Sequence, residues 1–420
     1  MQQSLLKLKL IAICCSAAIL LSACQDDNKD RRKPRPKANK QTTMQVSERK
    51  YSLDNLPEAK SIQVMTYHMP NVQGKTAKAT AMLMFPQTPQ PKDGWRVVVW
   101  GHGTVGIGDH CAPSNNALDV NFKTTAVGLL KAGYVIVAPD FEGLGTSGIH
   151  PYLNLGSASR SASYAMIAIK QLYQNQINGA WMSVGQSQGG HAALGIAEYA
   201  NDDRNYKGTV AAAPASSLDI IALGAPMVLE QLVAAGKQEV AIEGYAGLLT
   251  FAAYATVGIK AYEPQFNYKQ VFEPRSGEIA AYAEGSTGEQ GECLAPLYSR
   301  FSADIKDFLA RNKGKTVLDY PALNKDFNQN PSVKKFLLEN QPGTKKIKSP
   351  LMIIQGTADE AIPYVITVGL KDHLIELGTA LHFVPVEGAS HSQAIVQKND
   401  ELLKFVQQYM PASSLKEGML

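Results

Sequence analysis

The sequence has few of the residues that build metal and redox centres. Five cysteines and eight histidines are spread over 420 residues, and they form neither a Cys-x-x-Cys pair nor a His-Glu-x-x-His motif. The run Asp109-His110-Cys111 is too compact for a metal site and lacks a second ligand cluster. We therefore expect neither a metal ion nor an organic cofactor.

The body of the chain also lacks an excess of basic charge. The formal net charge is +4, but Lys7 and Lys9 contribute two of these charges, and residues 25–40 hold seven basic against three acidic side chains. The remainder is therefore about two charges negative. Because nucleic-acid binding needs a basic stripe on the folded body, the composition argues against a nucleic-acid partner.

The N-terminus predicts export and lipid attachment. Residues 1–23 combine Lys7 and Lys9 with an apolar stretch at 10–21, which is the layout of a signal peptide and too short for a comfortable membrane span. The junction Leu21-Ser22-Ala23-Cys24 resembles the bacterial lipobox, so we expect Cys24 to be lipidated. Gln25 after the cysteine favours the outer membrane, by resemblance to lipoproteins of two-membrane bacteria. An ordinary signal peptide remains the alternative.

The remaining cysteines allow one disulfide. Cys14 and Cys15 would leave with the signal and Cys24 would carry the lipid, which leaves Cys111 and Cys293. In an oxidising compartment these two are expected to pair, and two free buried thiols are the alternative.

The body of the chain alternates short apolar β-rich runs with helical patterns, which predicts an α/β fold with a mostly parallel sheet. Helices are expected at 161–173 and 363–377. The expected strands are residues 62–67, 78–85, 96–100, 134–139, 181–184, 209–213, 351–354 and 382–386.

One long interruption of this alternation predicts an inserted domain. Residues 217–346 carry no comparably clear strand, so we expect a mainly helical cap between two parts of the core, 46–216 and 347–420, with a flexible basic tether at 24–45. The first third of the insert is strongly apolar, but Pro226 and scattered charges argue against a transmembrane helix. Its apolar helices could be pure core or could line a substrate cavity.

The strongest functional signal is Gly185-Gln186-Ser187-Gln188-Gly189, which follows an apolar strand and opens a helical run. A G-x-S-x-G sequence in this setting is typical of a nucleophile elbow, in which a sharp turn projects the serine hydroxyl above the sheet. The N–H of the following residue then faces the developing oxyanion. Ser187 is therefore the candidate nucleophile and Gln188 a candidate oxyanion donor.

The base and the acid are expected late in the chain, in the order nucleophile, acid, histidine. His391 lies in a loop directly after the last expected strand, and Asp359 follows the strand before it. Glu360 is the competing acid. His102 and His191 are more typical of packed, hydrogen-bonded residues than of a base.

The second oxyanion donor is expected in the loop after an earlier strand, where Gly101-His102-Gly103-Thr104 follows Trp100. The backbone N–H of Thr104 is the candidate. Residues 101–106 also spell G-x-G-x-x-G, but Asp109 and Pro113 stand where a dinucleotide-binding helix would begin, so we exclude a nucleotide site.

Together these motifs resemble the secretory lipase family of the α/β-hydrolase superfamily, which includes fungal secreted lipases; the glutamines beside Ser187 make the resemblance more specific. It covers roughly residues 60–410 and implies hydrolysis of carboxylic esters through an acyl-enzyme, with a helical cap between nucleophile and acid. The expected partners are an ester substrate and, through the anchor, a membrane, with no obligate protein partner. A peptidase or amidase on the same triad, or a catalytically silent surface lipoprotein, are the alternatives.

Overall fold

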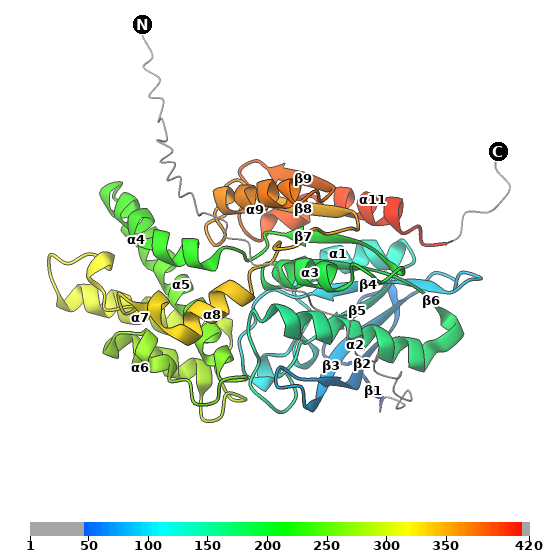
Figure 1. Cartoon of the computed structure of the whole chain (residues 1–420), viewed down its shortest axis with the longest axis horizontal. Coiled ribbons are helices and arrows are strands. Elements are labelled where there is room, and N and C mark those ends of the chain that lie inside the picture. Colours follow the sequence, from blue (N-terminus) through cyan, green and yellow to red (C-terminus); the bar gives the residue numbers. More distant parts are fainter. Residues whose placement is uncertain (1–45, 414–420) are drawn as a thin grey trace, which may run out of the picture. The chain divides into compact units, whose positions relative to one another are not determined.

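The computed structural model describes residues 46–413 (Figure 1). The predicted signal peptide at 1–23, the lipidation site Cys24 and the tether at 24–45 lie outside the described residues. The boundaries of these segments stay predictions.

A nine-stranded sheet runs through the described residues in the order β1-β2-β3-β5-β4-β6-β7-β8-β9. The first three strands join β5 in antiparallel fashion, and β5, β4, β6, β7, β8 and β9 are parallel to one another. The strands are β1 Ser47–Lys50, β2 Ala59–Pro70, β3 Thr76–Pro86, β4 Trp95–Gly101, β5 Val135–Pro139, β6 Ile177–Gln186, β7 Tyr206–Ala212, β8 Leu351–Gly356 and β9 Leu381–Val386.

All eight expected strands are present, and β1 was missed. Its four residues, Ser-Glu-Arg-Lys, are all exposed and polar, so they carry no apolar alternation that a sequence pattern could detect. The strand forms because its backbone pairs with the edge of β2. This pairing is a tertiary contact, and a local propensity scale would assign the segment to a loop.

Helices cover both faces of the sheet. One core packs strand residues such as Val98 and Ile136 against α1 (Val120–Lys131), α10 (Gln393–Gln397) and α11 (Asn399–Tyr409). The other core packs the alternate strand residues, among them Val97, against α2 (Leu155–Tyr173), α3 (Gln188–Tyr199) and α9 (Tyr364–Glu376). Because successive side chains of a strand point to opposite faces, each central strand is buried on both sides.

Between β7 and β8 the chain builds a separate helical layer, seen in green to yellow in Figure 1. Its helices are α4 Leu218–Ala234, α5 Gln238–Ile259, α6 Pro274–Glu284, α7 Leu294–Arg311 and α8 Pro331–Glu339. A third core, with Leu249, Tyr254 and Phe301 fully buried, lies within this layer. Among the described residues, α5 alone is long and apolar enough to cross a membrane, and half of its most apolar stretch is buried against the other helices.

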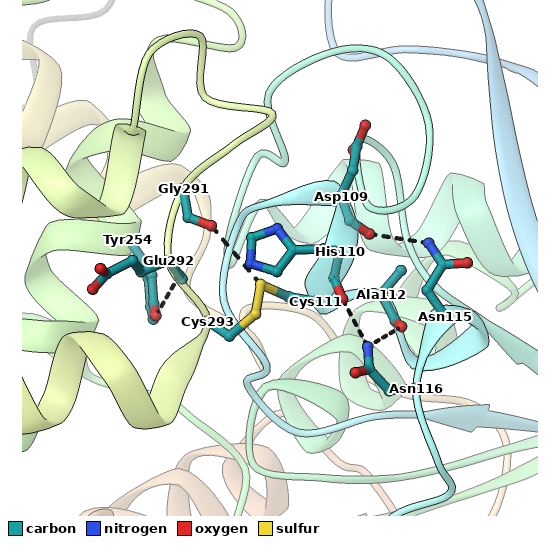
Figure 2. The surroundings of a disulfide bond; sticks show 10 residues. All are labelled: Asp109, His110, Cys111, Ala112, Asn115, Asn116, Tyr254, Gly291, Glu292 and Cys293. Carbon is teal, nitrogen blue, oxygen red and sulfur yellow. Dashed lines mark hydrogen bonds between the residues drawn. A yellow bond between two sulfur atoms is a disulfide. The ribbon is translucent and has the colours of Figure 1, made fainter. Parts of the chain in front are cut away.

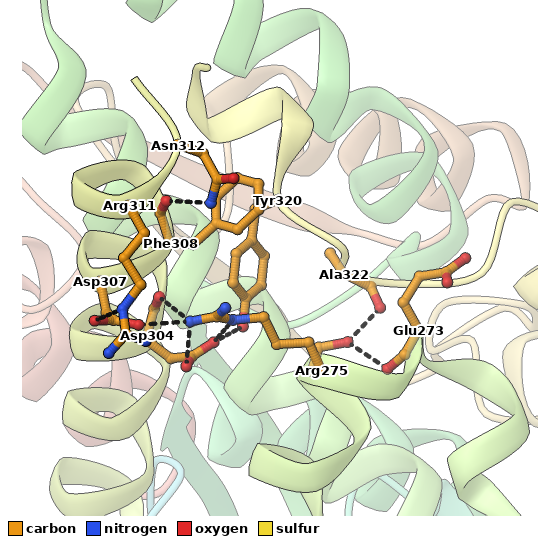
Figure 3. Close-up of polar contacts among 10 residues, drawn as sticks. Glu273, Arg275, Asp304, Asp307, Phe308, Arg311, Asn312, Tyr320 and Ala322 are labelled. Carbon is orange, nitrogen blue, oxygen red and sulfur yellow. Dashed lines mark hydrogen bonds and ion pairs between the residues drawn. The ribbon is translucent and has the colours of Figure 1, made fainter. Parts of the chain in front are cut away.

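A cluster of charged side chains ties α6 to α7 (Figure 3). Arg275 donates to both carboxylate oxygens of Asp304, at 2.7 and 2.9 Å, and to Asp307 at 2.9 Å. The Tyr320 hydroxyl donates to Asp304 at 2.7 Å. These bonds raise the pKa of Arg275, chiefly through Asp304. Paired, two-pronged contacts of this kind fix the relative orientation of the two helices.

The expected disulfide between Cys111 and Cys293 is present and joins the core to this helical layer (Figure 2). Next to it, the N–H of Leu294 donates to the carbonyl of Val105 at 2.8 Å, and the Tyr254 hydroxyl donates to the carbonyl of Glu292 at 2.9 Å. The start of α7 is therefore fastened to the loop after β4 by one covalent bond and one backbone hydrogen bond, and the segment before it is held to α5 by the Tyr254 hydroxyl.

Candidate active site

Ser187 lies on a sharp turn between β6 and α3. Its backbone has φ 60° and ψ −119°, a combination that residues other than glycine rarely adopt. The Ser187 N–H donates to the carbonyl of Ala212 in β7 at 2.9 Å, and the Ser187 carbonyl accepts from His191 in α3 at 3.0 Å, so β7 and α3 hold the strained residue in place. The predicted strand, turn and helix around the serine are therefore observed.

Gly189 permits this turn because α3 starts directly against β4. A Cβ added at Gly189 would lie 1.8 Å from the carbonyl oxygen of Gly101, which is closer than two non-bonded atoms can approach, so the backbone would have to move. Any side chain here would push the helix away from the sheet. The glycine in the motif is thus required by close packing.

Asp359 lies in the loop after β8, with its carboxylate fully buried. One carboxylate oxygen accepts from the N–H groups of Ala361 and Ile362, each at 2.9 Å, and the other accepts from the amide of Gln355 at 2.8 Å. Three donors compensate the cost of burying this charge and fix its direction.

His391 follows β9 and faces Asp359. Its Nδ1 lies 2.8 and 3.0 Å from the two carboxylate oxygens of Asp359. The bond to the carboxylate leaves Nε2 as the nitrogen that can accept a proton. Among the described residues no hydrogen bond joins Ser187 to His391, and nucleophile–base bonds in unliganded sites are often long until a substrate binds.

The structure brings the predicted acid and base together and places the competitor elsewhere. Glu360 is exposed, whereas Asp359 is buried against the imidazole. Sequence reasoning missed two glutamines. Gln355 orients Asp359, and Gln186 donates to the carbonyl of His391 at 3.1 Å. Gln355 could have been recognised from the sequence, because it is a polar residue near the end of an otherwise apolar strand.

The two candidate oxyanion donors come from different elements. The N–H of Gln188 belongs to the first turn of α3, where amide groups have no partner within the helix. Thr104 follows β4, and its hydroxyl shares a hydrogen bond of 2.7 Å with the Tyr152 hydroxyl. An anionic oxygen above Ser187 is also favoured by the positive end of the α3 dipole.

The other buried histidines near the elbow are held as neutral packing residues. His191 donates from Nε2 to the carbonyl of Asn340 at 2.8 Å, and burial lowers its pKa to about 4. Burial also lowers the pKa of His102, whose ring nitrogens face the backbone carbonyls of Gly103 and Asp140. Within residues 46–413, neither ring is hydrogen-bonded to Asp359.

One group of potential metal ligands lies within the described residues. The ligand atoms of His110, Cys111 and Cys293 lie within 4.8 Å of one another, and Figure 2 shows the imidazole beside the sulfur atoms. Both sulfurs are bonded to each other, so neither is available as a thiolate ligand. The arrangement is that of a disulfide with a neighbouring histidine.

Comparison with solved structures identifies the fold. Candida antarctica lipase A in its closed state superimposes with a TM-score of 0.63 at 17% identity, over 87% of this chain and 81% of that chain. The rice cell wall degrading esterase LipA from Xanthomonas oryzae gives a TM-score of 0.57 at 19% identity, over 84% of this chain and 91% of that chain. No family model and no curated protein sequence matches.

The chain therefore has the α/β-hydrolase fold, as predicted, with a helical layer inserted between β7 and β8. In this fold the strand-turn-helix elbow, the loop after β8 and the loop after β9 converge at the carboxyl edge of the parallel strands. Ser187, Asp359 and His391 occupy these three positions. A hydroxyl beside an imidazole that is held by a carboxylate can carry out acyl transfer.

Proposed function

We propose that this protein is a serine hydrolase of carboxylic esters, with Ser187 as nucleophile, His391 as base and Asp359 as the acid that orients it. The observation that carries the proposal is the strained serine at the β6–α3 elbow together with an imidazole held by a buried carboxylate. A strained turn persists only where the surrounding structure maintains it, and such turns concentrate at functional sites.

In the proposed reaction, the Ser187 oxygen attacks the ester carbonyl while Nε2 of His391 takes the hydroxyl proton. The backbone N–H groups of Gln188 and Thr104 bind the oxyanion of the tetrahedral intermediate. His391 then gives its proton to the leaving alcohol, which departs and leaves an acyl-serine. In the second half, His391 takes a proton from water while the water oxygen attacks the acyl-serine. His391 then returns this proton to the Ser187 oxygen as the bond to the acyl group breaks, and the acid product is released.

The proposed substrates are esters of apolar acyl chains. Three large apolar residues of α4 are exposed to solvent: Ile220, Leu223 and Met227 have exposed fractions of 56, 53 and 62%. It begins shortly after Ala215, whose N–H donates to the Ser187 carbonyl, so this apolar helix starts beside the nucleophile. Exposed apolar groups gathered near a site favour binding of apolar ligands.

The test is hydrolysis of nitrophenyl butyrate and nitrophenyl palmitate by the full chain in detergent, beside its Ser187→Ala variant. Ser163→Ala, which removes a serine hydroxyl from α2, is the matched control and should keep full activity. Serine-dependent cleavage supports an esterase, and cleavage of the palmitate ester points to a lipase. Near-normal turnover by Ser187→Ala contradicts the proposal.

Two other outcomes would redirect the assignment. Cleavage of peptide or anilide substrates without ester cleavage would indicate a peptidase or amidase on the same residues. A folded protein that neither turns over esters nor reacts with a fluorophosphonate would be a silent binding lipoprotein.

We also propose that Cys24 anchors the protein by a lipid to the bacterial outer membrane. The support is the lipobox-like sequence before Cys24 and Gln25 after it. Labelled palmitate should enter the wild type and not Cys24→Ala, and membrane fractionation should place the wild type with outer-membrane markers. Equal labelling of both forms contradicts the anchor.

A further inference from the structure

The loop between β5 and α2 contacts both residues that are proposed to bind the oxyanion. The Nε2 atom of His150 lies 3.0 Å from the side-chain amide of Gln188. Two residues later, the hydroxyl of Tyr152 lies 2.7 Å from that of Thr104. One short segment therefore reaches the elbow after β6 and the loop after β4, which come from separate parts of the chain.

The imidazole of His150 is fixed in one orientation and one tautomer. Its Nδ1 lies 2.7 Å from the backbone carbonyl of Glu142, which can only accept, so Nδ1 carries the hydrogen. Nε2 is then the acceptor for the Gln188 amide. The ring stacks parallel to Phe141, with centroids 6.5 Å apart, and burial lowers the pKa of His150 to about 3, so it stays neutral in ordinary buffers.

Tyr152 is fixed by contacts on its other sides. Its N–H donates to the carbonyl of His150 at 2.8 Å, which ties the two residues into a tight turn. Its ring meets Tyr254 of α5 edge-on, with centroids 5.8 Å apart. A Cβ added at Gly258 would lie 2.8 Å from the Tyr152 nitrogen, so α5 packs directly on this segment.

We infer that His150 and Tyr152 are positioning residues that together aim the backbone N–H groups of Gln188 and Thr104 at the oxyanion. The inference rests on the proposed ester hydrolysis. Donors stabilise a developing oxyanion only when they lie within about 0.5 Å of the required place, so side chains that prevent rotation of the two peptide units maintain the rate. Neither His150 nor Tyr152 touches the reacting atoms in this scheme.

The experiment uses Tyr152→Phe, which removes one hydroxyl, and His150→Phe, which removes the acceptor for Gln188. Tyr134→Phe is the matched control, because the buried Tyr134 hydroxyl makes a single hydrogen bond, to the carbonyl of Met410. We expect each positioning variant to lower kcat on nitrophenyl butyrate by roughly tenfold and to change KM by no more than about twofold. The expected loss is smaller than the roughly 100- to 1000-fold decrease in kcat that follows removal of a whole oxyanion donor. Tyr134→Phe should lower the melting temperature similarly and leave kcat unchanged.

A conservative replacement separates positioning from packing. In His150→Gln the side-chain carbonyl can accept from Gln188 and the amide can donate to Glu142, so kcat should recover to within about threefold of the wild type. Wild-type kcat in both Tyr152→Phe and His150→Phe overturns the inference while ester hydrolysis stands. Equal loss of kcat in Tyr134→Phe also overturns it, and a wild type without Ser187-dependent turnover overturns the proposed function and the inference together.

Discussion

Removal of the Cys111–Cys293 bond is expected to cost a large part of the stability of this protein. The perturbation is the double variant Cys111→Ala/Cys293→Ala, which leaves no free thiol at either position. The bond closes a loop with a sequence separation of 182 residues. In the chain-entropy model, a loop of this length lowers the free energy of the folded state relative to the unfolded chain by about 5 kcal/mol.

The structure indicates that this loss comes from the unfolded chain and not from displacement of the folded one. The bonds from Leu294 to Val105 and from Tyr254 to Glu292 hold the same segment without the sulfur atoms. The double variant should therefore keep its fold and its Ser187-dependent activity at low temperature. Because residual contacts compact the unfolded chain, 5 kcal/mol is the upper value, and at least about 2 kcal/mol is expected.

The assay is urea unfolding followed by circular dichroism, under non-reducing conditions, with the wild type and the double variant side by side. Wild type treated with a reductant should unfold at the same urea concentration as the double variant, and the double variant should not respond to the reductant. The slope of free energy against urea should rise without the bond, because the unfolded chain exposes more surface. A loss below about 1 kcal/mol, or a response of the double variant to the reductant, would refute the reasoning.

Three further predictions concern single side chains. Gln355→Leu leaves the buried Asp359 carboxylate without one of its four donors, so it should cost about 1 to 3 kcal/mol of unfolding free energy and lower kcat, and unchanged values of both would contradict the role of Gln355. The pKa of His191 is lowered from 6.5 to about 4, so its neutral form stabilises the fold above pH 6.5, and this stability is lost as the pH falls from 6.5 toward 4. Between pH 7 and 4 the wild type should lose about 3 kcal/mol more than His191→Gln in urea unfolding, and parallel curves would show that the shift is absent. Arg275→Met should lower the unfolding free energy by about 1 kcal/mol, since the cluster is partly exposed, with Arg275→Lys in between; wild-type stability in Arg275→Lys would mean that the two-pronged contact contributes nothing beyond its charge.

The turn that carries Ser187, the proposed nucleophile, could be predicted from the sequence because the elbow is a local structure. Five consecutive residues around Ser187 encode the turn, the space that it needs and the start of α3, and the apolar residues before them encode the strand. The contact between Asp359 and His391, the proposed acid and base, could be expected because each residue follows an apolar strand, in the chain order that the fold implies. The choice of Asp359 over Glu360 agrees with the observed contact to the imidazole.

The side chains that orient the proposed catalytic and oxyanion-binding residues could not be predicted from spacing along the chain. His150 and Gln188 lie 38 positions apart, and Gln186 and His391 lie 205 positions apart, so no spacing along the chain relates them. The start of α2 was also predicted wrongly, because the helix begins at Leu155 and not at residue 161. Serines at the start of this helix weaken the apolar pattern, and their hydroxyls bond to backbone carbonyls one turn earlier in the helix.

By itself, the sequence determined the alternation of strands and helices, the elbow that carries Ser187, and the pair of cysteines available for a disulfide. Each of these follows from residues that are neighbours in the chain or from simple counting. Only the tertiary structure decided which side chains orient Asp359 and His391, that β1 joins the sheet, and that one segment with His150 and Tyr152 reaches both proposed oxyanion donors. These contacts depend on how the strands are ordered in the sheet and how the inserted helices pack on it, and polar side chains carry no periodic signal for either.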